Sequence, residues 1–304
     1  MLAVGGLSIA VPRKPWKDMM MDYCYKNING LRLRVGISTP RRYPEQKLPL
    51  LLCNGLGASI ELMQPIVDAL ESTQVVIFDP PGIGLSEPSD QVFRLSELAD
   101  MAYEIMTSLG HQYFNVMGVS WGGGLAQMIA RNHRDACCNL ILAATGTGMF
   151  MIPGKLSVLK LLSSPRRYKD PEYAETIMPD IYGGVFRENP DLLKKLTGKG
   201  VPPTDQGYQN QLAAGVGWTS VWWLHTLKQP TLILMGKDDP IVPSVNGMIF
   251  RSLIRKSELK LFDCGHLFMV TQPEQTAGAI NQFLLKHKTG SCRPFLATEQ
   301  GCAV

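Results

Sequence analysis

Gly118-Val119-Ser120-Trp121-Gly122 is the stretch of this 304-residue chain that decides its fold. An apolar strand is expected at residues 115–117 before it, and a helix from Trp121 to Arg131 after it. A serine at such a strand-to-helix turn is strained and exposed, and glycines on both sides let the turn close. The segment therefore predicts a nucleophile at Ser120, rather than an idle serine in a glycine-rich turn.

A nucleophilic serine needs a base, and His266 is the histidine expected to supply it. It follows an apolar strand predicted at residues 259–262, on the kind of late loop that carries such a base. The other histidines are expected at helix ends, on a basic helix or packed beside tryptophans: His111, His133, His225 and His287. No histidine pair has the spacing of a metal site, so we expect no metal and no cofactor.

The base in turn needs an orienting acid between Ser120 and His266 in the chain. Two adjacent aspartates, Asp238 and Asp239, follow a strand predicted at residues 231–235. We choose Asp239 because it lies deeper in the loop and has the usual Gly-x-x-Asp spacing. The resulting order of serine, aspartate and histidine is that of the α/β-hydrolases.

An oxyanion hole is the third requirement of serine chemistry. One donor is expected to be the backbone N–H of Trp121, directly after the nucleophile. The second is expected from Leu56, in the loop after an apolar strand at residues 50–53. Most α/β-hydrolases have His-Gly in this loop, whereas this chain has Asn54-Gly55. Because the donation comes from the backbone, the change need not weaken the site.

Composition agrees with a soluble enzyme. The chain is 45% hydrophobic and has a formal net charge of +4, with scattered basic residues, so nucleic acid is not an expected partner. It has no apolar run of the length that spans a membrane. Seven cysteines without a framework pattern predict a reducing compartment and no disulfide scaffold.

The chain divides into a core with one insertion. We predict a mostly parallel central sheet with helices on both faces and an inserted, mainly helical cap. The core is expected at residues 21–147 and 227–288, and the cap at 148–226, where the alternation of strands and helices stops. Residues 1–20 are expected to form a leader and residues 289–304 a loose tail.

The predicted cap is rich in aromatic side chains, which favours an apolar ester as substrate. Some of these aromatics are expected only to pack the cap onto the core. The residues proposed from the sequence to contact substrate, in the cap and beside the reacting groups, are Asn54, Phe150, Tyr182, Trp218, Trp222, Trp223, Leu267 and Phe268.

Motifs in both core and cap resemble the intracellular polyhydroxyalkanoate depolymerases that act on medium-chain-length storage polyester. They span about residues 22–288: Gly118–Gly123, Leu142–Thr145, Pro153–Lys155, Ser164–Tyr168, Ile181–Gly184, Gly217–Ser220, Gln229–Leu232 and Gly265–Phe268. The resemblance implies an α/β-hydrolase fold with Ser120, Asp239 and His266 as its triad. It also implies cleavage to 3-hydroxyalkanoic acids or oligomers, and a cytoplasmic location at granules of the hydrophobic polyester.

Other functions stay open at this point. A lid-bearing carboxylesterase or lipase would use the same residues on other hydrophobic esters. A granule-associated protein with an idle site is a non-enzymatic alternative. Polyester synthases have a cysteine at the position of Ser120, and haloalkane dehalogenases and epoxide hydrolases have an aspartate, so the serine argues against these classes.

Overall fold

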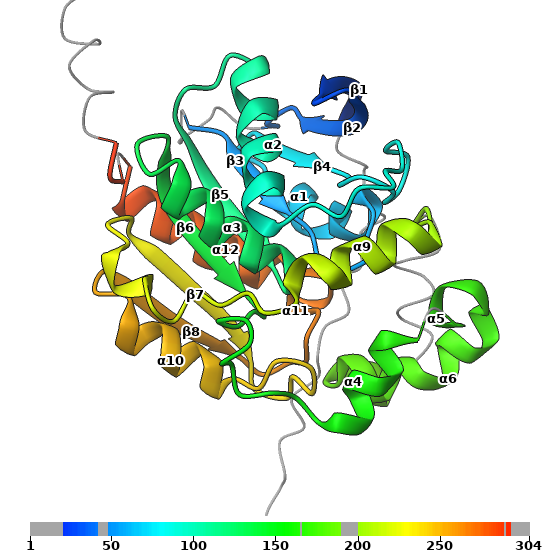
Figure 1. The fold of residues 1–304 in the computed structure, drawn as a ribbon. Coiled ribbons are helices and arrows are strands. Elements are labelled where there is room, and N and C mark those ends of the chain that lie inside the picture. The colour runs from blue at the N-terminus through cyan, green and yellow to red at the C-terminus, as the bar shows by residue number, and fades with distance from the viewer. Residues whose placement is uncertain (1–20, 42–47, 165, 190–199, 289, 293–304) are drawn as a thin grey trace, which may run out of the picture.

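The computed structural model describes residues 21–41, 48–164, 166–189, 200–288 and 290–292. Eight strands form one sheet in the order β1-β2-β4-β3-β5-β6-β7-β8 (Figure 1). Strands β3 to β8 run parallel, whereas β2 is antiparallel to both β1 and β4. The strands are β1 Met21–Ile28, β2 Leu31–Ser38, β3 Leu50–Cys53, β4 Val75–Phe78, β5 Phe114–Val119, β6 Cys137–Ala143, β7 Thr231–Gly236 and β8 Ser257–Phe262.

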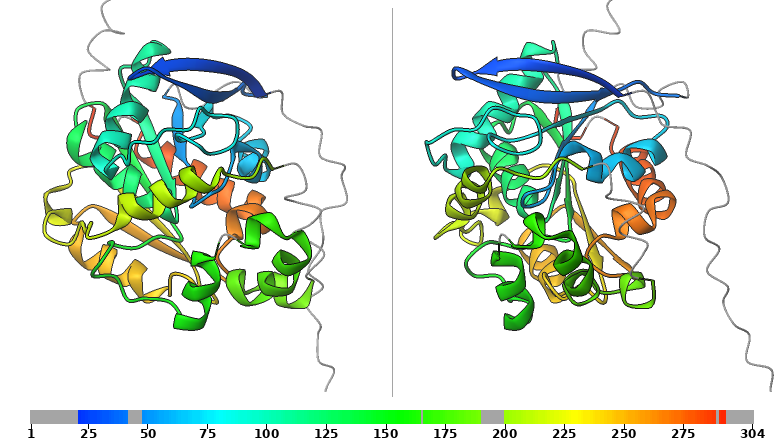
Figure 2. Two further views of the ribbon diagram at one scale, coloured as in Figure 1. Left: turned by 45° about the vertical axis from the view of Figure 1, so that its right-hand side comes forward. Right: turned by 90° about the vertical axis from the view of Figure 1, so that its right-hand side faces the viewer.

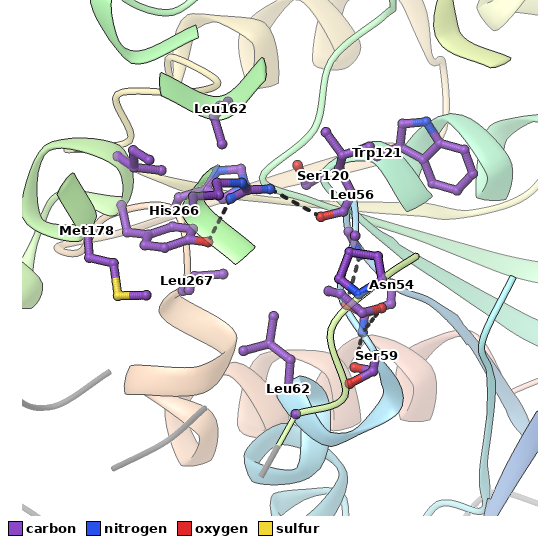
Figure 3. Close-up of a pocket in the computed structure, with 18 of the residues that line it drawn as sticks. Asn54, Leu56, Ser59, Leu62, Ser120, Trp121, Leu162, Met178, His266 and Leu267 are labelled. Carbon is purple, nitrogen blue, oxygen red and sulfur yellow. Dashed lines mark hydrogen bonds between the residues drawn. The ribbon is translucent and has the colours of Figure 1, made fainter. Parts of the chain in front are cut away.

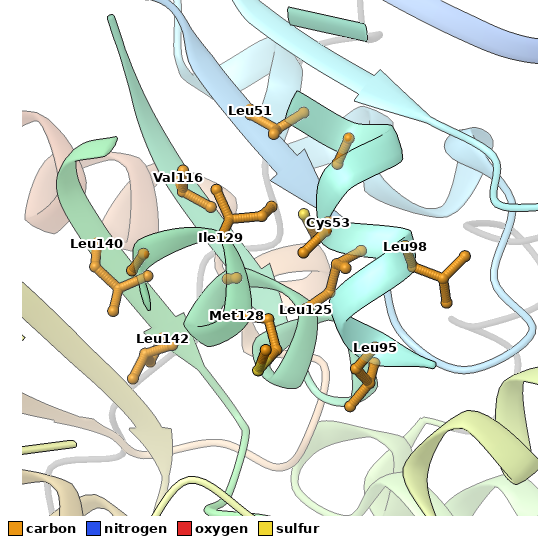
Figure 4. Packing of buried hydrophobic residues seen from close by; sticks show 14 of the residues in the cluster. Leu51, Cys53, Leu95, Leu98, Val116, Leu125, Met128, Ile129, Leu140 and Leu142 are labelled. Atoms are coloured by element: carbon orange, nitrogen blue, oxygen red, sulfur yellow. The ribbon is translucent and has the colours of Figure 1, made fainter. Parts of the chain in front are cut away.

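The central strands are apolar on both faces because helices cover both sides of the sheet. Successive side chains point to opposite faces of a strand. In β3, Leu51 accordingly joins one hydrophobic cluster, while Leu50 and Leu52 join the other. Figure 4 shows the first cluster, in which Leu125 and Met128 meet the sheet. This explains why the strands appear as continuous apolar runs in the sequence.

Helices α2, α3 and α10 pack on one face, and α1, α11 and α12 on the other (Figure 2). Together with the mostly parallel sheet, this arrangement confirms the predicted fold class. The helices and one 3-10 turn are η1 Ile60–Met63, α1 Gln64–Ala69, α2 Leu95–Ser108, α3 Trp121–Asn132, α10 Val245–Leu253, α11 Phe268–Thr271 and α12 Pro273–Lys286.

Short helices between β6 and β7 lie at the carboxyl end of the parallel strands (Figure 1). Loops that follow parallel strands gather at this end of the sheet, so these helices stand above the predicted nucleophile. They are α4 Leu156–Ser163, α5 Arg166–Lys169, α6 Pro171–Tyr182, α7 Val185–Glu188, α9 Asp205–Gly215 and the 3-10 turn η2 Leu224–Thr226.

A disulfide joins Cys138 in β6 to Cys292, 154 residues later in the chain. It corrects the expected loose tail at residues 290–292, and it differs from what the predicted reducing compartment would lead one to expect. Residues 290–292 are not loose, since the Ser291 N–H donates to the Cys138 carbonyl at 2.9 Å and Cys292 is 2% exposed. A disulfide is also not what a reducing compartment predicts, because thiols stay reduced there. The described cysteines outside this bond are free thiols: Cys24, Cys53, Cys137 and Cys264.

Within the described parts of the chain, the structure contains no helix long and apolar enough to cross a membrane. The predicted leader, residues 1–20, and the last part of the predicted tail, residues 293–304, lie outside the described residues.

Candidate active site

Ser120 occupies the turn between β5 and α3 in a left-handed backbone conformation, with φ 53° and ψ −119°. Such a conformation is rare for a residue with a side chain and is a form of strain that clusters at functional sites. The neighbouring glycines allow it. A Cβ at Gly118 would overlap the Gly122 carbonyl, and a Cβ at Gly122 would overlap the Cys53 carbonyl. The sequence signature and the backbone geometry therefore agree at this turn.

His266 and Asp239 form a buried pair at the ends of two neighbouring strands. Nδ1 of His266 lies 2.7 Å from Oδ2 of Asp239, and both side chains are at most 4% exposed. The other carboxylate oxygen of Asp239 accepts the N–H groups of Ile241 and Val242, each at 2.9 Å. These bonds fix the carboxylate and so direct the ring of His266. His266 and Ser120 line the same cavity.

Asp238, the competing aspartate, has a different environment. Its side chain is 49% exposed and pairs with Arg187. It also accepts the backbone N–H of Gly184 at 2.7 Å. Asp238 therefore attaches the loop after β7 to the loop before α7, and the structure brings Asp239 rather than Asp238 to His266.

The loop after β3 passes beside the nucleophile. Leu56 and Trp121, the residues predicted to supply the oxyanion hole, line the cavity next to Ser120 (Figure 3). Asn54 also lines the cavity, but its side chain is used within the loop. Its amide donates to the Ser59 carbonyl at 2.7 Å, and its oxygen accepts the Gly55 N–H at 2.8 Å. Asn54 thus holds the shape of the loop, and these bonds account for its side chain without a contact to substrate.

A cavity of about 520 Å³ opens above Ser120 between the core and the cap. This volume lies in the usual range for sites that bury most of a small ligand. One wall is an apolar stripe of helix α6 that the sequence analysis missed: Ala174, Ile177, Met178 and Ile181. Their spacing of three, one and three residues is the signal of a helix face, and it was available in the sequence.

Arg167 gives this apolar cavity a cationic group. Its guanidinium donates to the Tyr182 hydroxyl at 3.3 Å, the Tyr208 hydroxyl at 3.5 Å and the Leu56 carbonyl at 3.5 Å. Burial raises the pKa of Tyr208, so this phenol stays neutral. Tyr182 also stacks against the ring of His266, with 6.3 Å between ring centroids. The cap and the loop after β3 therefore meet at this arginine.

Of the substrate contacts predicted in the cap and beside His266, Tyr182 and Leu267 line the cavity, whereas five others do not. Phe268 is fully buried and stacks on Phe262, with 4.6 Å between centroids. Of the other four, Trp218 and Trp223 pack against α3, whereas Phe150 and Trp222 are exposed to solvent.

The two adjacent tryptophans have opposite environments. Trp223 is 9% exposed, with Arg131 over its ring and Trp218 at 6.5 Å, so it packs the cap onto the core. Trp222 is 69% exposed and meets the ring of Phe150 edge-on at 5.6 Å. Neither tryptophan lines this cavity, so their contact with substrate stays a prediction.

Trp222 and Phe150 belong to an exposed apolar surface that we call the Phe150 patch. Asn246 connects helix α10 to the segment before α4: its side-chain amide exchanges two hydrogen bonds of 2.9 Å with the backbone N–H and carbonyl of Ile152. The patch consists of large apolar side chains that are each at least 47% exposed: Met149, Phe150, Ile152, Leu156, Trp222 and Met248. Exposed apolar areas of this kind mark sites of interaction on soluble proteins.

The described residues contain no group of three or more histidine, cysteine or acidic side chains that could hold a metal ion. The groups present at the site are those of acyl transfer: a strained serine, a histidine held by a carboxylate, and backbone N–H groups beside them.

Comparison with known proteins places these features in a family. The family model described as alpha/beta hydrolase fold matches residues 49–273. A poly(3-hydroxyalkanoate) depolymerase from Ectopseudomonas oleovorans is 42% identical over 241 residues, which cover 79% of this chain and 85% of the relative. This similarity confirms the resemblance found in the sequence.

More distant relatives share the fold. A 2-hydroxymuconate semialdehyde hydrolase from Pseudomonas putida is 25% identical over 271 residues, covering 83% of this chain and 92% of the relative. The crystal structure of the enol-lactonase from Burkholderia xenovorans LB400 superposes with a TM-score of 0.74 at 21% identity. That superposition covers 86% of this chain and 99% of the lactonase.

Proposed function

We propose that this chain, which belongs to the α/β-hydrolase family and within it to the poly(3-hydroxyalkanoate) depolymerases, hydrolyses the ester bonds of that polyester through a serine acyl-enzyme. The observation that carries the proposal is the apolar cavity, which has Ser120 and His266 on its wall. An ester with an apolar acyl chain is the substrate that matches both the reacting groups and the cavity.

In the proposed mechanism, Ser120 attacks the ester carbonyl while His266 takes its proton. Asp239 holds His266 in the tautomer that leaves Nε2 able to accept that proton. The backbone N–H groups of Leu56 and Trp121 stabilise the negative oxygen of the tetrahedral intermediate. His266 then protonates the departing 3-hydroxyl group, and water hydrolyses the acyl-enzyme by the same sequence of proton transfers.

We propose medium-chain-length polyester as the preferred substrate. The α6 stripe and the neighbouring Leu62 and Leu162 offer an apolar wall that an alkyl side chain of several carbons can cover. Each buried methylene contributes roughly 0.8 kcal/mol, so longer alkyl groups bind more tightly until the cavity is full.

The polymer itself is insoluble, and the Phe150 patch supports a role in adsorption to it. Segments 149–163 and 240–256, which carry most of the patch, contain no aspartate or glutamate but include Lys155 and Arg251. A polyester surface is apolar and carries carboxylates at chain ends, so an apolar patch beside cations matches it. We accordingly propose that the protein works at the surface of cytoplasmic storage granules. The support for that location is the family. The Cys138–Cys292 disulfide is a separate feature, one that is not typical of cytoplasmic proteins.

The test is a panel of purified substrates: medium-chain polyester latex, short-chain polyester, a triglyceride emulsion and a soluble nitrophenyl ester. Chromatography and mass spectrometry of the products measure the rate and the identity of the released acids. We expect 3-hydroxyalkanoic acids or oligomers, released fastest from the medium-chain polyester. Faster hydrolysis of the triglyceride than of any polyester would instead identify a lipase.

A further inference from the structure

We propose that Gln211, in the middle of cap helix α9, is a positioning residue that holds the two donors of the oxyanion hole at a fixed separation. The inference rests on the proposed function, because it concerns the same Leu56 and Trp121 N–H groups. It adds a second residue of the cap to these two loops of the core, beside Arg167, which donates to the Leu56 carbonyl.

Gln211 accepts two hydrogen bonds, one from each side of the oxyanion hole. The side-chain oxygen accepts the backbone N–H of Gly57 at 2.7 Å, and Gly57 directly follows Leu56. The backbone carbonyl accepts the indole N–H of Trp121 at 2.8 Å. A single residue therefore contacts the loop after β3 and the first residue of α3.

Gln211 acts through other groups rather than on substrate. It is 3% exposed and is not among the residues that line the cavity. A buried amide is retained where its hydrogen bonds are made, because an unpaired one costs about 1–3 kcal/mol. Removal of its side-chain oxygen would leave the Gly57 N–H without this buried acceptor.

The loop after β3 is held from outside by Gln211 at Gly57 and by Arg167 at the Leu56 carbonyl. Gly57 has a φ of +68°, a left-handed conformation that allows the loop to turn beside Ser120. The loop's own bonds, such as Asn54 to Ser59, set its shape, and Gly122 of α3 packs on the carbonyls of Cys53 and Asn54 at its base. The Gln211 bond holds the loop further along, at Gly57. Oxyanion donors must lie within a few tenths of an ångström of their working positions, so the distance between the loop and α3 decides how well they act.

Helix α9 is itself anchored to the core, so it can serve as a fixed reference. Thr204 precedes the helix, and its backbone N–H donates to the Gly82 carbonyl at 2.9 Å. The Thr204 hydroxyl donates to the same carbonyl at 3.0 Å, and Gly207 in the first turn of the helix packs directly against Gly82. These bonds hold the helix on the loop after β4, independently of its bonds to the oxyanion hole.

The test compares Gln211→Met, which keeps the shape of the side chain but loses the acceptor oxygen, with Asn210→Ala as a matched control. Asn210 is the neighbour of Gln211, and its amide donates to the carbonyls of Ser89 at 2.8 Å and Gln91 at 3.3 Å. Asn210→Ala therefore removes peripheral bonds between the same helix and the core, away from Ser120. Rates are measured with a soluble nitrophenyl ester and normalised to the folded fraction. Affinity is measured for a boronic acid, which forms a tetrahedral adduct with a catalytic serine, and for a neutral ester analogue that cannot react.

For Gln211→Met we expect kcat to fall roughly 10-fold to 100-fold, below the 10²–10³-fold loss typical when a donor is removed outright. Affinity for the boronic acid should fall by a similar factor. KM and the affinity for the neutral analogue should change less than about threefold, because the interaction is made only in the transition state. Asn210→Ala should leave all of these within about twofold. Gln211→Asn, whose shorter amide withdraws the acceptor but stays polar, is the second variant and should show the same pattern.

The inference is overturned if both Gln211 variants keep kcat within twofold of the wild type. It is equally overturned if the affinities for the boronic acid and the neutral analogue fall together, or if Asn210→Ala loses as much activity as Gln211→Met. A wild-type protein without activity on any ester would instead contradict the proposed function, so the two failures are distinguishable.

Discussion

Replacing Asp239 by asparagine separates the chemistry of the site from its architecture. The carbonyl oxygen of an asparagine can still accept the Ile241 and Val242 N–H groups, which Asp239 accepts at 2.9 Å. The amide nitrogen then faces Nδ1 of His266, where the carboxylate lay at 2.7 Å. Two donors cannot bond to each other, so the imidazole adopts the tautomer with its proton on Nε2 and can no longer accept the proton of Ser120.

The magnitude follows from these contacts. Loss of the correct tautomer should lower kcat by about 10⁴-fold, or about 5.5 kcal/mol of transition-state stabilisation. The folded state loses mainly one charge-assisted hydrogen bond, so the free energy of unfolding should fall by only about 1.5–3 kcal/mol. Asp238→Asn is the control. Its carboxylate is half exposed and pairs with Arg187, an interaction of at most about 1 kcal/mol, and activity should change less than threefold.

The assay is hydrolysis of a soluble nitrophenyl ester, together with urea unfolding of each variant. Equal losses of kcat in the two variants, or a larger loss in Asp238→Asn, would refute the assignment of Asp239. An Asp239→Asn variant that keeps a tenth of wild-type kcat would refute the role given to the carboxylate.

Three further outcomes are expected. Trp222→Ala should lower adsorption and hydrolysis of polyester latex several-fold and leave hydrolysis of a soluble ester unchanged; equal effects on both substrates would contradict a role of the Phe150 patch in adsorption. Trp223→Ala should instead lower the free energy of unfolding by about 3–5 kcal/mol, because it removes a buried aromatic ring. Reduction of the Cys138–Cys292 disulfide should lower the free energy of unfolding by at most about 5 kcal/mol, from the closure of a long loop, and a reductant should have no such effect on Cys292→Ser; a wild type insensitive to reductant would show that the bond does not form. Burial raises the pKa of Asp79 from 3.8 to about 7, so between these pH values the folded protein keeps a proton that the unfolded chain releases. As the pH rises through this window, the free energy of unfolding of the wild type should therefore fall, relative to that of Asp79→Asn, by up to about 1.4 kcal/mol per pH unit. A difference between the two proteins that stays constant with pH would contradict the raised pKa.

The fold class could be predicted, and the candidate triad located in the chain, because their signals are local. Gly118–Gly122 combines a strand end, a turn and a helix start in five residues, and the motif is tied to one kind of fold. The apolar face of α6, formed by Ala174, Ile177, Met178 and Ile181, has the spacing of a helix and could also be recognised in the sequence. The predicted substrate contacts favour the tryptophans of the cap instead.

Other features depend on contacts between distant parts of the chain. Trp222 and Trp223 are neighbours in the sequence, and only the packing of Trp223 on α3 decides which of them is buried. Cysteine pairing cannot be deduced from one sequence, and Cys138 and Cys292 lie 154 residues apart. The same separation of 154 residues divides Gly57 from Gln211, so no local pattern could link them.

The central claim, that Ser120 is the nucleophile for polyester hydrolysis, is tested most directly by Ser120→Ala on medium-chain polyester latex. The measured quantity is the rate at which 3-hydroxyalkanoic acids are released, with unfolding curves to show that the variant folds. We predict a loss of roughly 10⁶-fold, as for removal of the nucleophile in other serine hydrolases, with stability close to that of the wild type. A folded variant that releases the same acids at a tenth of the wild-type rate or faster would contradict the account.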